Sequence, residues 1–204
     1  MTKTASLLFL FFFLISCSKA HASKAKGPAP VAAPEVPPEA LTWDADVYLV
    51  NFDSAQEAKV HKAVELIKKV IATKVFRDRV LNYTYKGKKR FVDNDGFTNA
   101  QIYQKLLSGA EIIGNRKPNN TMDVELELYY ENTSTIGYTY PNTVRIWMNK
   151  KFFDKYTPEQ VADNLIHEWT HKLGFGHAMK WSRKRDHSVP YAIGYLVEEL
   201  IGKL

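Results

Sequence analysis

The segment 157–174 carries helix signals at both of its ends. Thr157 and Gln160 have the spacing of a capping box, and Pro158 stands where a helix begins. Gly174 suits the left-handed backbone conformation that often ends a helix. At about 100° per residue, the apolar residues between these ends fall on one arc, which predicts a helix that packs against a core and runs to residue 173. The residues of this arc are Ala162, Leu165, Ile166, Trp169 and Leu173.

The opposite arc of the same helix is polar and holds His167, Glu168 and His171. Two histidines four residues apart lie one turn apart, so both imidazoles can converge on a single Zn²⁺ ion. Glu168 stands beside them and suits a general base, which takes a proton from the water that attacks a carbonyl group. Gly174 allows the chain to reverse after the helix and to bring back His177 as a third ligand. These three histidine ligands would leave the fourth coordination position of one catalytic zinc ion open.

The fixed positions of the metzincin metalloprotease motif all have counterparts in this chain, at His167, Glu168, His171, Gly174 and His177. The chain therefore resembles the metzincins, mainly over residues 144–191 and more loosely in the order of its elements over 43–204. The resemblance implies a zinc-dependent endopeptidase. It also implies a fold in which a long early helix and a mixed β-sheet precede the zinc-binding helix.

A second implication of the resemblance concerns substrate binding, because metzincins bind extended substrates along an edge strand of the sheet. The candidate strand in this sequence contains Gly137, Tyr138, Thr139 and Tyr140. Main-chain pairing along it would supply affinity, and side-chain pockets would select residues. An internal strand is the alternative interpretation of this segment.

The sequence departs from the metzincin pattern after the third histidine, where that family has a turn with a methionine beneath the metal. The chain has no methionine after Met179, which is too close to His177. Val189 is the best counterpart of the methionine. Tyr191 then stands where some subfamilies carry a tyrosine that stabilises the transition state, and a role as an oxyanion donor is expected. A core tyrosine is the alternative.

The N-terminus has the pattern of an export signal. Lys3 precedes an apolar run at 5–15 that is too short to span a bilayer. The run ends in Leu14-Ile15-Ser16-Cys17, which resembles the lipobox of bacterial lipoproteins, so residues 1–16 are expected to be removed and Cys17 to be lipidated. An ordinary signal peptide with an incidental cysteine is the alternative. The resemblance implies a lipid anchor in the bacterial cell envelope, and Ser18 favours the outer membrane.

The segment 17–42 is expected to be a tether between the lipidated cysteine and a single domain at 43–204. It contains five of the nine prolines and almost no large apolar side chain. The whole chain is 45% hydrophobic, which suits a globular domain. Cys17 is the only cysteine, so an internal disulfide is excluded, and once it is lipidated no thiol remains that could block the zinc.

The order of the remaining elements predicts an α+β fold with a mixed sheet. Apolar and polar residues alternate at 123–130, as in a half-buried strand. Ser54 and Glu57 are expected to form the capping box of a long helix, whose apolar residues recur at helical spacing as far as Val75. The turn at 93–96 lacks the first and last acidic ligands of a calcium-binding loop, so a plain turn is favoured. Further strands are expected at 47–52, 135–140 and 144–149, a helix at 99–107 and a basic hairpin at 83–92.

Two function classes fit these features. The first is a membrane-tethered endopeptidase that acts on proteins or peptides, with cell-wall peptides as a further possible substrate. The second is a catalytically inactive, zinc-stabilised binding lipoprotein, which would have no need of Glu168. The net charge of +6 is modest and no nucleic-acid-binding motif accompanies it, so no nucleic acid partner is expected. The pattern leaves the oligomeric state open.

Overall fold

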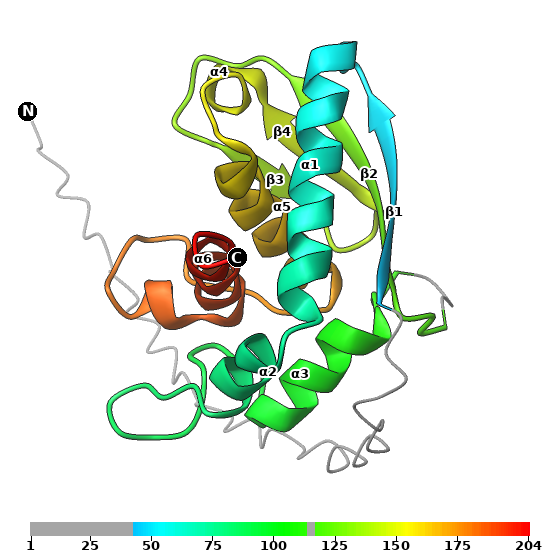
Figure 1. The fold of residues 1–204 in the computed structure, drawn as a ribbon. Helices are drawn as coiled ribbons and strands as arrows, with labels where there is room; N and C mark the ends of the chain where they lie inside the picture. Colours follow the sequence, from blue (N-terminus) through cyan, green and yellow to red (C-terminus); the bar gives the residue numbers. More distant parts are fainter. Residues whose placement is uncertain (1–42, 114–116) are drawn as a thin grey trace, which may run out of the picture. The chain divides into compact units, whose positions relative to one another are not determined.

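The computed structural model describes residues 43–113 and 117–204 of the chain (Figure 1). The predicted signal peptide, the lipidation site at Cys17 and the tether lie outside these residues. None of the described helices combines the length and the hydropathy needed to cross a bilayer.

The described residues form one four-stranded mixed sheet, with strands β1 (Asp44–Val50), β2 (Thr121–Tyr129), β3 (Gly137–Thr139) and β4 (Arg145–Asn149) in the order β1-β2-β4-β3. The first, second and fourth strands are parallel, and β3 runs antiparallel to β4 along one edge. Alternate residues of β2 are buried, as the period-2 pattern predicts. The coarse prediction of an α+β fold with a mixed sheet is therefore confirmed.

The described part of the chain has six α-helices, and the longest of them cover one face of the sheet. Figure 1 shows α1 and α5 beside each other over one face of the sheet, and α6 packs against both of them. The buried side chains of β2 and of these helices join in one hydrophobic core, to which Trp43 and Trp169 contribute an edge-to-face pair at 5.9 Å. The helices are α1 (Ser54–Ile71), α2 (Lys74–Leu81), α3 (Asn99–Ser108), α4 (Lys150–Phe153), α5 (Pro158–Lys172) and α6 (Val189–Ile201).

The start and the end of α1 differ from the sequence prediction. The capping box is formed by Asp53 and Gln56, not by Ser54 and Glu57. Gln56 also donates from Nε2 to Asp154 at 2.8 Å, so this register adds a tertiary hydrogen bond that the alternative register lacks. Helix α1 ends at Ile71. Val75 therefore lies in α2 and is 54% exposed, and it does not continue the apolar face.

The segment 83–92 forms only a minimal version of the hairpin that its sequence suggested. One antiparallel bridge joins Tyr85 to Lys88 across a tight turn, and Val92 forms a parallel bridge with Ser188. Aromatic packing replaces strand pairing, because Tyr83 stacks on Phe91 at 4.1 Å. The hydroxyl of Tyr83 also lies 2.6 Å from Nδ1 of His187, which attaches this segment to the chain just before α6.

Candidate metal centre and cleft

Helix α5 forms as its end signals predict. Both hydrogen bonds of the capping box between Thr157 and Gln160 are present, and Pro158 occupies the first turn. The apolar arc is fully buried, and Trp169 within it donates from Nε1 to the Glu111 carboxylate at 2.7 Å. This buried contact ties the helix to the segment after α3. The helix is therefore held on its apolar side while its polar side faces the cleft.

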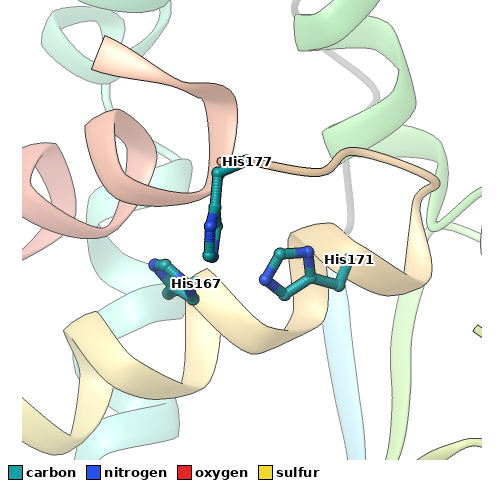
Figure 2. A group of neighbouring side chains, drawn as sticks. All are labelled: His167, His171 and His177. Carbon is teal, nitrogen blue, oxygen red and sulfur yellow. The ribbon is translucent and has the colours of Figure 1, made fainter. Parts of the chain in front are cut away.

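The reversal after α5 also follows the prediction. Leu173 is the C-cap of the helix, and Gly174 has a φ of +93°, a conformation that side chains with a Cβ rarely adopt. The backbone N–H of Gly174 donates to His171 at 3.0 Å, and that of Phe175 donates to Thr170 at 3.2 Å. The chain then returns towards α5 and places His177 opposite the other two histidines (Figure 2).

The structure brings His167, His171 and His177 together. One ring nitrogen from each histidine lies within 4.8 Å of the others, so the three could hold a single metal ion. Figure 2 shows two rings rising from α5 and the third reaching down from the returning chain. The distances between ring centroids are 5.0–5.2 Å. This convergence fits a metal with three imidazole ligands and one open position.

Hydrogen bonds to backbone carbonyls orient two of these rings. Nδ1 of His171 lies 2.7 Å from the carbonyl oxygen of Phe175, and Nδ1 of His177 lies 3.2 Å from that of Ala178. A carbonyl oxygen can only accept, so each Nδ1 carries the proton and each Nε2 is left free for a metal. Burial lowers the pKa of His171 to about 4 and that of His167 well below its ordinary value. Neutral imidazoles, the form that binds metals, are therefore favoured at neutral pH.

Glu168 stands between the histidines and the cleft. It is 5% exposed, and it has no hydrogen bond or ion pair with any described residue. Burial raises the pKa of Glu168 to about 8, and the nearby Lys172 only partly opposes this shift. A divalent cation held by the three histidines would lower this pKa, because it stabilises the carboxylate. The side chain is thus placed to bind and release a proton.

Lys172 follows the second histidine and has a structural role that the sequence did not reveal. Its side chain is fully buried, and Nζ donates to the carbonyl oxygens of Tyr140 at 3.0 Å and Arg145 at 2.9 Å, and also to that of Thr143. Two of these carbonyls belong to the turn between β3 and β4, and the third, that of Arg145, belongs to the first residue of β4. The lysine therefore fastens this turn to the last turn of α5.

Strand β3 lies at an edge of the sheet, as a strand that binds an extended substrate must. It pairs only with β4 among the described strands, and it includes Gly137, Tyr138 and Thr139. Tyr140 lies just beyond its end. A Cβ on Gly137 would stand 2.9 Å from Oδ1 of Asn164 on α5. The glycine thus allows the edge strand to approach α5 closely.

Two hollows meet at the histidine cluster, each with a volume of about 580 Å³. The α6-side cavity lies between α5, α6 and the segment before β3, and its walls include Asp163, His167 and Glu198. The β3-side cavity lies between β3 and the returning chain, and its walls include Tyr138, His171 and Phe175. Glu168 and His177 line both hollows. They therefore form one cleft, which crosses the histidine cluster alongside β3.

Tyr191 lies in this cleft next to the cluster, at the start of α6. Its ring centroid is 4.4 Å from that of His167 and 4.8 Å from that of His177. The guanidinium of Arg185 lies 4.6 Å from the centroid of the tyrosine ring. This arginine also lines the α6-side cavity. Val189 is fully buried in the first turn of α6.

Asp163 and Asn164 are site residues that the sequence analysis missed. Asp163 precedes His167 by four residues, so the helical period places it on the same face of α5. The four-residue spacing between Asp163 and His167 could therefore have identified Asp163 from the sequence. Glu198 faces the same cavity from α6, and no sequence pattern connects it with the motif.

Comparisons of the chain with protein-family models, with curated proteins and with solved structures found no significant match.

Proposed function

We propose that the chain is a zinc-dependent endopeptidase of the metzincin type, with His167, His171 and His177 as metal ligands and Glu168 as general base. The observation that supports this most directly is the position of Glu168. It is a buried carboxylate without a partner among the described residues, it adjoins three convergent imidazoles, and it opens into a cleft beside an edge strand.

Zinc is the metal that suits a ligand set of three neutral imidazoles. When bound, it would polarise the scissile carbonyl and lower the pKa of the attacking water.

The residues of the chain supply the remaining steps of the proposed reaction. An extended peptide pairs its main chain with β3, which holds the scissile bond over the histidines. Glu168 accepts a proton from the attacking water and later passes it to the leaving amine. Tyr191 donates a hydrogen bond to the oxygen on which negative charge develops. The proposal places this reaction at a bacterial outer membrane, to which lipidated Cys17 would anchor the domain.

Glu168→Gln tests this function, because the substitution keeps the shape of the side chain and removes the base. The variant should fold and hold zinc like the parent, and its rate of peptide hydrolysis should fall at least ~10²-fold. Purified parent and variant are incubated with a broad peptide library, and the cleavage products are quantified by mass spectrometry. Glu65→Gln on α1, at an exposed acid, serves as the matched control.

A non-catalytic binding protein makes the opposite prediction. Neither parent nor variant would then cut any peptide, although both would hold the metal. A zinc-loaded parent that leaves the library and extracts of its own cell envelope intact would rule out the peptidase and leave only the metal site.

A further inference from the structure

The α6-side cavity has an unusual distribution of charge for the interior of a cleft. Asp163 of α5 and Glu198 of α6 both line it, together with His167. Two tyrosines, Tyr156 and Tyr195, complete the polar wall at this end. The proposed mechanism uses none of these four side chains.

Neither acid has a hydrogen bond or an ion pair with any described residue, in contrast to the acid next to them on α6. Glu199 binds Arg79 at 2.7 Å and also Lys203. The only lysine or arginine among the described residues of the cavity wall is Arg185. Its guanidinium lies over the ring of Tyr191 and donates to the carbonyl oxygen of Met179 at 3.3 Å. The two carboxylates therefore lack a cation.

The environment of Asp163 indicates that its charge is left uncompensated. Burial raises the pKa of Asp163 to about 7, and repulsion from Glu198 adds to this shift. A Cβ on Gly194 of α6 would clash with Oδ1 of Asp163. The absence of a side chain on Gly194 thus leaves room for the carboxylate where the two helices pack closely.

Two further polar groups indicate that a ligand completes this cavity. Glu168 is 5% exposed, has no partner among the described residues and opens into it. Oδ1 of Asn164, in the same wall, is buried and has no hydrogen-bond partner in the described part of the chain. Buried polar groups without partners are rare in folded proteins. A bound peptide would supply a partner for Asn164, and the attacking water would supply one for Glu168.

We infer that the α6-side cavity receives a lysine or arginine side chain of the bound peptide, and that Asp163 and Glu198 select it by charge. This inference rests on the proposed peptidase function and adds a substrate class to it. The cavity adjoins the histidine cluster and β3, so the selected residue lies next to the scissile bond. A volume of about 580 Å³ is within the range of ligand sites and exceeds the need of one long side chain.

The test compares peptides that differ at one residue, lysine or norleucine, which has an apolar side chain of similar length. The substitution is placed in turn at each position flanking a mapped cleavage site. We expect kcat/KM of the parent to be at least about tenfold higher for lysine at one of these positions. In the Asp163→Asn, Glu198→Gln double variant the two peptides should differ less than about threefold, and the norleucine peptide should be cut at the parent rate.

The neighbouring acid provides the control. Glu199→Gln removes one carboxylate from the same turn of α6, but from a position that binds Arg79 and Lys203. It should keep the preference for lysine unchanged. The single variants Asp163→Asn and Glu198→Gln are measured as well, so that a folding defect of the double variant does not decide the result. Zinc content and circular dichroism establish that each variant is folded.

A binding measurement separates failure of this inference from failure of the proposed function. Zinc-loaded Glu168→Gln protein is titrated with the lysine and norleucine peptides by calorimetry, and lysine should bind at least about tenfold more tightly. Cleavage by the parent without preference for lysine overturns the cavity assignment and leaves the peptidase intact. If the parent cuts nothing, the titration still tests the inference. Equal affinity for the two peptides, or no measurable binding of either, overturns it.

Discussion

The imidazole of His171 donates its Nδ1 proton to the carbonyl oxygen of Phe175 at 2.7 Å, across the glycine that follows α5. The same short segment that reverses the chain thus fixes the tautomer of one ligand. The third ligand, His177, follows two residues later. The geometry of the site consequently depends on the turn as much as on the helix.

We expect one zinc ion per chain, held by the three histidines. Ligand that binds only the folded state at a hundred times its Kd stabilises a protein by about 2.7 kcal/mol. Thermal unfolding with added zinc should therefore occur several degrees higher than with a chelator. His177→Ala should abolish this shift, whereas His61→Ala, at an exposed histidine of α1, should preserve it. Full zinc retention by His177→Ala would contradict the ligand assignment.

Tyr191→Phe should lower kcat on the order of a hundredfold, which is the usual effect of removing one oxyanion donor. The tyrosine ring packs 4.4 Å from that of His167, and phenylalanine keeps this packing. Zinc content and KM should therefore change little. Steady-state kinetics on the best library peptide provides the measurement. Unchanged turnover would assign the tyrosine a packing role only.

Lys172→Met should lower the free energy of unfolding by about 2 kcal/mol or more, because three carbonyl oxygens lose their donor and each buried unpaired group costs about 1 kcal/mol. Urea denaturation at saturating zinc measures this change. Lys74→Met is the matched control. That lysine side chain is 81% exposed and pairs only with Asp78, so its removal should cost less than ~0.5 kcal/mol.

Glu199→Gln should make stability less sensitive to acid. Hydrogen bonds from Arg79 and Lys203 lower the pKa of Glu199 to about 2. A lowered folded-state pKa stabilises the protein above the ordinary carboxyl pKa, and this stabilisation is lost as the pH falls towards 2. The metal-free variant should therefore be slightly less stable than the parent at pH 7, and this difference should shrink below about pH 4 and close near pH 2. A gap between the two urea midpoints that is constant with pH would refute the assignment.

Cys17→Ser should release the protein from membranes, because the lipobox is the one anchoring feature that the sequence suggests. Membrane and soluble fractions of cells producing parent and variant are compared by immunoblotting. Ser18→Ala keeps the cysteine and should fractionate with membranes like the parent. A Cys17→Ser protein that stays with membranes would place the anchor elsewhere.

Much of the site could be predicted from the sequence because its ligands lie within 11 residues. Capping signals and a glycine fix the path of that segment, and the three histidines then converge through local geometry alone. The edge position of β3 depends instead on strand order. Tyr138 could be named as a candidate, but its place at the edge could not be derived from the local pattern.

Other features escaped prediction because they depend on contacts between distant segments. Asp53 caps α1 in place of Ser54, and the Gln56 of this capping box also donates to Asp154, almost a hundred residues away. The burial of Lys172 depends on three carbonyls of another element. A lysine beside a metal ligand gives no indication in the sequence that it has such partners.

The fastening of the β3–β4 turn to α5 has a consequence for what the proposed enzyme could digest. The strand proposed to receive substrate and the helix proposed to carry the base are joined by partly buried hydrogen bonds, so they are expected to move as one rigid body. The cleft then cannot adapt its width to a helix or to a folded loop. Only chains that are already extended could lie along the strand, which would confine cleavage to unfolded proteins, flexible linkers and short peptides.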